Sequence, residues 1–187
     1  MTEVARPRLL SINVGMPREI EWAGERVLTS IFKNPIPGPV AVRTLNIDGD
    51  RQSDLTVHGG ARKAVYVYPH EHYAFWRTQL PHADLGFGAF GENLTISGLL
   101  ESDVSGGDVL KIGTAAFSVT VPRMPCYKLG IRFARADMVK RFWRSGRCGF
   151  YLAVTGEGEI APGDDLRLTR TSGERPTIAE TFAQRLV

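Results

Sequence analysis

The sequence is poor in cysteine, and no apolar run approaches the length of a membrane-spanning helix. Residues 1–7 lack the apolar core of a secretory signal, so we expect a cytoplasmic protein with no membrane partner. In a reducing compartment the two cysteines, Cys126 and Cys148, are not expected to form a disulfide. Neither lies in a Cys-x-x-Cys pair, and His70 and His72 point to different sides of an expected helix. This spacing does not indicate a structural zinc site.

The sequence also lacks the regular alternation of strand and helix that a parallel α/β sheet requires. Alternating apolar residues between Gly, Pro and Asp turns predict about eight short strands, with helices only at 69–80, 136–143 and 177–186. With 43% hydrophobic and 23% charged residues, the 187 positions are typical of one folded domain with a core rather than of a disordered chain. The pattern favours a mainly β fold, a closed and mostly antiparallel barrel with helices at its rim.

Acidic residues are nearly absent from one stretch of the chain. Residues 123–147 contain eight Lys or Arg and a single acid, Asp137, for a local charge of +7 against +3 for the whole chain. Such a block indicates an anionic partner, either a phosphate-bearing cofactor or substrate or a nucleic acid. A solvated helix face is the alternative for its outer arginines.

The clearest candidate for chemistry is Cys126, which follows an alternating strand at 117–121. Pro122 ends that strand, and Pro122 and Pro125 together place the cysteine on a stiff loop. Arg123 and Lys128 flank it, and nearby cations stabilise a thiolate over a thiol. Cys126 could therefore be a nucleophile, a redox centre or a metal ligand. A buried structural cysteine is the alternative.

Two glycine-rich stretches suggest ligand contacts of different kinds. His58-Gly59-Gly60-Ala61-Arg62-Lys63 could bring main-chain N–H groups, His58 and Lys63 to one anion, and a glycine turn with solvated cations is the alternative. His58 could also act as a base for Cys126 in a hydrolase, although nothing in the sequence places an orienting carboxylate. The three glycines at 86–91 do not predict a dinucleotide site, because no strand precedes them and no helix follows.

Five short motifs occur in one order and together resemble the MOSC family, named for the molybdenum cofactor sulfurase C-terminus. The match is strongest with its stand-alone bacterial branch, which is related to hydroxylaminopurine reductases. The resemblance runs from about residue 14 to residue 168. The motifs are Gly49-Asp50-x-Gln52-x-Asp54, His58-Gly59-Gly60 with Lys63-Ala64-Val65-Tyr66, Phe90-Gly91-Glu92-Asn93-Leu94, Gly107-Asp108, and Pro122-Arg123-x-Pro125-Cys126-x-Lys128-Leu129.

The resemblance implies a MOSC-type closed antiparallel β-barrel over residues 1–170. It also implies that residues 171–187 are a helical tail, equivalent to the start of a three-helix extension found in relatives. The bound group would be Mo-molybdopterin, the molybdenum cofactor, with Cys126 as the protein ligand of the metal. The other residues implied to bind the cofactor are His58, Lys63, Arg123 and Arg147 at its anionic group, and Glu92 and Asn93 at the pterin ring.

The activity that the resemblance implies is a two-electron reduction of N-hydroxylated compounds, such as hydroxylaminopurines, to amines. Cys126 would be the catalytic residue, and a separate reductase would supply the electrons. One alternative is a carrier of sulfur or of the cofactor, in which Cys126 bears a persulfide without any need for pyridoxal phosphate. A nucleic-acid binding module that uses the basic block is a third reading and is less expected.

Overall fold

Strands supply most of the regular structure, because apolar residues alternate along them as the sequence predicts. The computed structural model describes residues 6–53 and 59–185. In β10 (Ala115–Pro122), Phe117 and Val119 are buried, whereas Ser118 and Thr120 between them are only half-buried. One face of this strand therefore belongs to the core and the other faces outward.

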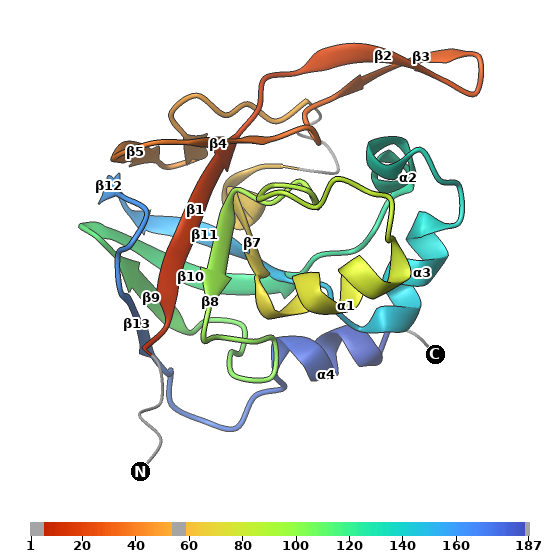
Figure 1. Cartoon of the computed structure of the whole chain (residues 1–187). Coiled ribbons are helices and arrows are strands. Elements are labelled where there is room, and N and C mark those ends of the chain that lie inside the picture. The colour runs from red at the N-terminus through yellow and green to blue at the C-terminus, as the bar shows by residue number, and fades with distance from the viewer. Residues whose placement is uncertain (1–5, 54–58, 186–187) are drawn as a thin grey trace.

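Eight strands form one sheet that curls around the core (Figure 1). Their order across the sheet is β13 (Leu166–Thr169), β9 (Val109–Ile112), β10, β11 (Phe150–Gly156), β7 (Val65–Pro69), β8 (Leu94–Ser97), β1 (Arg8–Val14) and β4 (Asn34–Ile36). All neighbours are antiparallel except β7 and β8, which are parallel. A helix and a long loop lie between these two strands, and parallel neighbours need such a crossover.

The prediction of a mainly β fold with a few helices is confirmed, but within the described residues no strand ladder joins β13 to β4. The sheet is held in its curled form by backbone hydrogen bonds between the start of β1 and the segment that enters β13. The N–H of Leu9 donates to the carbonyl of Asp164 (2.9 Å), and the N–H of Gly163 donates to the carbonyl of Leu9 (2.7 Å). Within the described residues, the expected closed barrel is therefore not formed as one continuous strand ladder.

The smaller elements surround this sheet. They are the hairpin β2 (Arg18–Trp22) and β3 (Glu25–Thr29), the three-stranded sheet of β5 (Val40–Arg43), β6 (Asn46–Ile47) and β12 (Gly158–Ile160), the 3₁₀ turn Ala61–Lys63, and the helices α1 (Glu71–Gln79), α2 (Tyr127–Phe133), α3 (Met138–Ser145) and α4 (Ile178–Ala183). Three of the helices were predicted, and α2 was not. None of the described helices is long and apolar enough to cross a bilayer.

Aromatic side chains join the helices to the sheet. Tyr68 on β7 stacks on Phe90 with ring centroids 4.7 Å apart, and Trp76 on α1 stacks on Phe142 of α3 at 6.0 Å. All four side chains are buried, and aromatic pairs of this kind stabilise a core beyond their burial alone. The cluster fixes α1 and α3 side by side against the sheet (Figure 1).

Candidate functional site

A cleft opens beside Cys126, and it holds about 630 Å³ of space counted to its open mouth. Segments far apart in the sequence form its walls, namely residues from 29–33, 50–53, 63–66, 91–93 and 123–128 together with Tyr151. A concave site in which polar and charged side chains converge beside a few aromatic and apolar ones is suited to a small polar molecule.

Cys126 lies where β10 gives way to α2. Pro122 is the last residue of the strand, and Cys126 has extended backbone (φ −127°, ψ 172°) immediately before the first turn of the helix. Its side chain is half-buried and lines the cleft. Cys148 differs, because it is fully buried and burial raises the pKa of its thiol well above the ordinary value. Cys148 is therefore the structural cysteine of the two.

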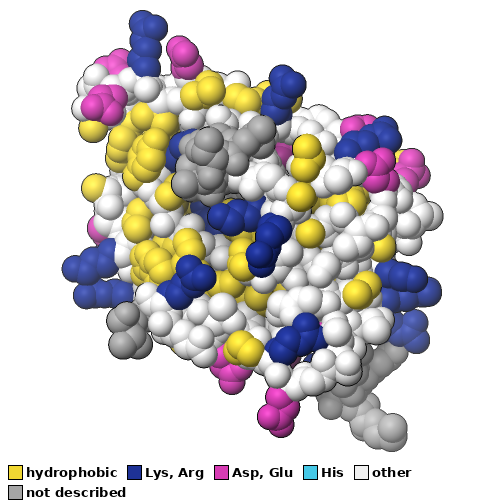
Figure 2. All heavy atoms as spheres, turned by 180° about the vertical axis from the view of Figure 1, so that it is seen from behind, with side chains coloured by type: hydrophobic (Ala, Val, Ile, Leu, Met, Phe, Trp, Pro, Cys, Tyr) yellow, Lys and Arg dark blue, Asp and Glu magenta, His cyan; other side chains and the backbone are white. Residues whose placement is uncertain are grey.

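The cleft is cationic. Its lining includes Lys33, Lys63, Arg123 and Lys128 against one carboxylate, Asp50, so four positive charges against one negative give +3. Figure 2 shows lysine and arginine side chains near the middle of the face turned away from the viewer in Figure 1, with hydrophobic side chains beside them. A concave site with one sign of charge attracts small anions.

The one carboxylate that lines the cleft within the described residues already has its partners. Asp50 accepts hydrogen bonds from the N–H of Gly15 (2.8 Å) and the side-chain amide of Asn93 (2.9 Å), and it forms a buried ion pair with Lys33. Burial lowers the pKa of Lys33, and the attraction of Asp50 opposes this effect. Asp50 therefore compensates Lys33, and Lys63, Arg123 and Lys128 are the other cationic side chains that line the cleft.

Arg123 is the most unusual residue of the cleft. Only 6% of it is exposed, and its guanidinium carbon lies 5.0 Å from the ring centroid of Tyr66 and 5.1 Å from that of Phe142. Burial acts to lower the pKa of Arg123, but nearby Tyr66, Tyr151 and Cys126 raise it overall, so the group is charged. Its Nη1 atom is buried and has no hydrogen-bond partner within the described residues. A buried cationic donor without a partner is costly, which makes Nη1 a ready contact for an anion.

Lys63 reaches the cleft from the segment after the glycine pair. The side-chain amide of Gln52 donates to the carbonyl of Lys63 (2.9 Å), and its oxygen accepts from the N–H of Gly60 (3.2 Å). These bonds fix the turn, and Lys63 Nζ lies 6.0 Å from the ring centroid of Tyr151. His58, predicted to act with Lys63, lies outside the described residues.

The family of the chain follows from sequence comparison. The family model of the MOSC domain matches residues 54–167, which is more than half of the chain. The uncharacterized protein YflK of Bacillus subtilis is 42% identical over 181 residues, which span 97% of this chain and 80% of YflK. The chain belongs to the MOSC domain family.

Other relatives agree with this family. Protein YiiM of Escherichia coli is 37% identical over 142 residues, or 75% of this chain and 63% of YiiM. A protein named reductase from Gibberella moniliformis is 35% identical over 171 residues, which span 90% of this MOSC protein and 29% of the reductase. The crystal structure of YiiM from Geobacillus stearothermophilus superimposes with a TM-score of 0.79 at 35% identity and covers 96% of this chain and 83% of that one. The fold of this MOSC protein is therefore that of YiiM.

The structure brings four of the predicted residues, Lys63, Asn93, Arg123 and Cys126, to one cleft, but it does not bring Glu92 there. The carboxylate of Glu92 is fully buried and accepts from the N–H groups of Gly88 and Phe90 (both 3.0 Å) and from the hydroxyl of Thr95 (2.9 Å). Glu92 therefore holds the glycine-rich loop in place.

The glycines of that loop approach protein rather than an open ligand space. A Cβ atom at Gly91 would lie 2.8 Å from Ile31 Cγ1, and one at Gly88 would lie 2.9 Å from the carbonyl oxygen of Lys33. Asn93 follows the loop, and its amide oxygen accepts from the N–H of Tyr66 (3.0 Å) while its nitrogen donates to Asp50. The loop thus positions the wall of the cleft at 31–33.

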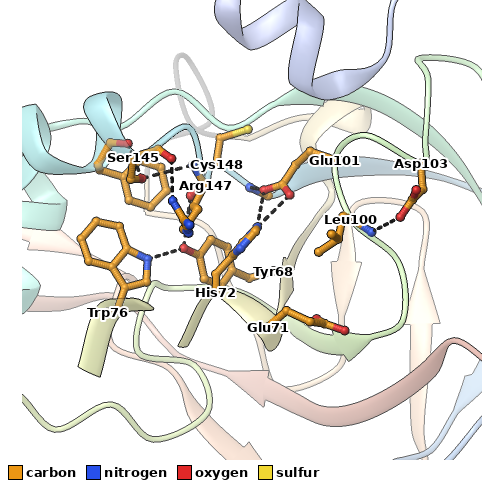
Figure 3. Close-up of polar contacts among 12 residues, drawn as sticks. Tyr68, Glu71, His72, Trp76, Leu100, Glu101, Asp103, Ser145, Arg147 and Cys148 are labelled. Carbon is orange, nitrogen blue, oxygen red and sulfur yellow. Dashed lines mark hydrogen bonds and ion pairs between the residues drawn. The ribbon is translucent and has the colours of Figure 1, made fainter. Parts of the chain in front are cut away.

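Arg147 also lies away from Cys126. Its guanidinium carbon is 3.9 Å from the ring centroid of Phe75, and its Nη1 donates to the carbonyl of Ser145 (2.9 Å). Figure 3 shows Arg147 beside Ser145 and Tyr68, close to a second polar pair, His72 and Glu101. Glu101 is buried and His72 half-buried, with 2.8 Å between His72 Nε2 and a Glu101 oxygen, and the other Glu101 oxygen accepts from the N–H of Gly149 (2.6 Å).

Replacing Glu101 with glutamine is expected to lower the free energy of unfolding by about 2 kcal/mol at neutral pH, because a charged acceptor of two buried donors is lost. Burial acts to raise the pKa of Glu101, but the hydrogen bond and attraction of His72 bring it below the ordinary value. The carboxylate therefore stabilises the fold above the ordinary glutamate pKa, and this contribution is lost as pH falls through the lowered pKa. Urea titrations at pH 7 and pH 3.5 measure both effects.

The control for this change is Glu71→Gln, because Glu71 is exposed although it also accepts a backbone hydrogen bond, from Gly98 (2.6 Å). Glu71→Gln should lower the free energy of unfolding much less than Glu101→Gln does. If the difference in free energy of unfolding between Glu101→Gln and wild type stayed constant from pH 7 to pH 3.5, the carboxylate of Glu101 would not stabilise the fold in the way assigned to it.

Sequence reasoning missed the wall formed by residues 29–33. Ser30 has a buried hydroxyl with no hydrogen-bond partner among the described residues, and Lys33 is buried against Asp50. The one available signal was that Lys33 is the only charged residue between Arg26 and Arg43. A cation isolated in an apolar and proline-rich stretch is a candidate for a buried partner.

Proposed function

We propose that this MOSC protein binds a molybdopterin-type molybdenum cofactor in the cleft and reduces N-hydroxylated compounds, such as hydroxylaminopurines, to amines. The observation that carries the proposal is the juxtaposition of half-buried Cys126 with the unpartnered Nη1 of Arg123 in one cationic cleft. The likeness to a protein named reductase supports a reductive role. A separate electron-donating reductase completes the proposal.

The residues of the cleft fit such a group. No cluster of three or more His, Cys, Asp or Glu side chains suited to a metal occurs in residues 6–53 and 59–185, so a metal here must bring further ligands with it. A pterin dithiolene brings two sulfurs, and a cysteine thiolate is a soft ligand of the same kind. The phosphate of the pterin would find the guanidinium of Arg123 and the ammonium groups of Lys63 and Lys128 on the walls.

When bound, the cofactor would supply a two-electron redox centre for breaking an N–O bond. Cys126 would hold the metal through its thiolate, and the positive charge of Arg123 would favour that thiolate over the thiol. Tyr151 lines the cleft, and burial raises the pKa of its hydroxyl, so it keeps its proton at neutral pH and can donate a hydrogen bond to a substrate. We keep His58 and Asn93 as proposed cofactor contacts, and Glu92 and Arg147 as residues that act from outside the cleft.

The proposal is tested on protein made by a host that synthesises the cofactor. Near-stoichiometric molybdenum and released pterin are expected, together with conversion of 6-N-hydroxylaminopurine to adenine when reduced methyl viologen supplies the electrons. Metal-loaded protein that leaves the hydroxylaminopurine unchanged would refute the reductase. Protein with neither metal nor pterin, even after incubation with free cofactor, would refute the cofactor.

The half-buried position of Cys126 on a loop between cations also suits a persulfide, so a carrier of sulfur or of the cofactor is the second candidate. Its signature would be a persulfide on Cys126, detected by mass spectrometry after alkylation, in protein that shows no reductive turnover.

A further inference from the structure

A second concave site lies between α1 and α3, which pack side by side (Figure 1). This groove holds about 870 Å³ of space counted to its open mouth. Phe75 and Trp76 of α1 supply its aromatic part, and the polar side chains of α3 supply the opposite wall. Trp76 Nε1 donates to the hydroxyl of Tyr68 (2.7 Å), as Figure 3 shows, so the indole N–H is already satisfied.

The rim of the groove is strongly positive. Lys140 and Arg144 line it and are exposed, and their side chains make no hydrogen bond or ion pair within the part of the chain that the structure describes. Arg141 lines it too and donates to Asp137 (2.6 Å), which is the only acid among the lining residues. Arg147 adds a fourth cation, because its guanidinium covers Phe75 at 3.9 Å. Four cations against one carboxylate leave a charge of +3 around the groove.

The groove lies directly behind the cleft of Cys126. The ring of Trp76 is nearly parallel to that of Phe142 (12°), with centroids 6.0 Å apart. Phe142 also contacts the guanidinium of Arg123, which lies 5.1 Å from its ring centroid, and Arg123 lines the cleft together with Cys126. One aromatic ring thus separates the floor of the groove from the cationic wall of the cleft.

We propose that the groove between α1 and α3 is the docking site of an acidic electron-carrier protein. The inference rests on the proposed function, because reduction of R–NHOH to R–NH₂ and H₂O consumes two electrons and two protons. The N–O bond breaks, the protons come from water, and a one-electron carrier must be oxidised twice for each turnover. A carrier seated on the groove would lie against Trp76, which Phe142 separates from Arg123 on the wall of the cleft.

The positive charge of the groove and its limited extent favour an acidic electron-carrier protein as the partner. Complementary charge steers a protein partner and raises its association rate, and complexes of electron-transfer proteins have small interfaces. A nucleic acid fits less well, because the eight residues of α3 span only about 12 Å and Asp137 interrupts the positive rim. Binding of a nucleic acid usually involves phosphate contacts along a longer track.

The test uses the metal-loaded protein and a plant-type [2Fe–2S] ferredoxin as an acidic probe. Reversing both rim charges in Lys140→Glu/Arg144→Glu is expected to weaken ferredoxin binding, measured by calorimetry at low salt, by about tenfold or more. The KM for ferredoxin in hydroxylaminopurine reduction should rise by a similar factor. Turnover with reduced methyl viologen should stay unchanged, because a small reductant needs no docking surface.

The matched control is Lys111→Glu/Arg167→Glu, an exposed Lys and Arg that face each other on β9 and β13. This variant should bind ferredoxin as wild type does. The proposal is overturned if wild type binds no ferredoxin, if the groove variant binds as well as wild type, or if the control loses as much. Competition by a 20-nucleotide single strand at 150 mM salt would assign the groove to nucleic acid instead. Absence of turnover with methyl viologen would reject the proposed function. The binding measurement tests the docking site independently of that activity.

Discussion

Protein with Cys126→Ala is expected to lose its molybdenum and to reduce hydroxylaminopurine more than about 100-fold more slowly than wild type. Cys126 is the one cysteine in the cleft, and no cluster of other metal-binding side chains in the described residues could replace it. Changes outside the inner ligand set already cost about 10- to 100-fold in metal affinity or activity, so loss of a ligand should cost more. Elemental analysis and the rate with reduced methyl viologen measure the two effects.

The matched control is Cys148→Ala, which removes the same atoms from the buried cysteine. It should retain metal and activity, although it should lose some stability because a filled core position becomes smaller. Circular dichroism of both variants separates a loss of metal from a loss of fold. Equal molybdenum in wild type and Cys126→Ala would contradict the assignment of Cys126 as the ligand.

The sequence predicted Cys126 because its surroundings are local. The strand of β10, the two prolines and the flanking cations lie within a dozen residues, and each acts on the backbone or charge of its neighbours. The ion pair of Lys33 and Asp50 could not be predicted in this way. These residues lie 17 positions apart, and only the packing of the sheet brings them together.

The fold likewise has features that neighbouring residues determine and features that depend on the packing of distant segments. Alternation along single strands was enough to predict a mainly β chain, but the parallel pair β7 and β8 depends on how the chain between them crosses the sheet. The helix α2 was missed because it has only seven residues, contains Gly130 and directly follows the cysteine loop. Glycine is needed at position 130 because a Cβ atom there would lie only 2.9 Å from the carbonyl oxygen of Arg135. The pattern of residue types along the sequence does not reveal this close approach.

Glu92 and Arg147 were predicted from sequence motifs, but neither side chain lines the cleft. Glu92 belongs to a motif of the family, yet its carboxylate is used by the loop that carries the motif. Arg147 belongs to the basic block, yet its guanidinium lies on Phe75. A charged residue within a motif can thus support the site through the backbone that it positions, and only its contacts in the structure distinguish this role from direct contact with a ligand.

Replacing Arg123 with methionine is expected to have opposite effects on stability and on cofactor binding. In the protein without cofactor, Arg123 buries a charged nitrogen that has no partner among the described residues, so its removal should raise the free energy of unfolding by about 1 kcal/mol. Cofactor retention should fall by about 100-fold, because a buried charge-assisted contact to the phosphate is lost. Urea titration of the apo protein and pterin content of the loaded protein measure the two quantities.

Arg175→Met is the matched control, because Arg175 also has a buried nitrogen without a partner in the described residues, but it bonds to the carbonyl of Gly106 (2.6 Å) and does not line the cleft. It should retain the cofactor. If Arg123→Met instead lost stability and kept its pterin, Arg123 would be a packing residue between Tyr66 and Phe142, and the phosphate would depend on Lys63 and Lys128 alone. A higher free energy of unfolding together with a loss of pterin in Arg123→Met would show that Arg123 serves to bind an anion rather than to stabilise the fold.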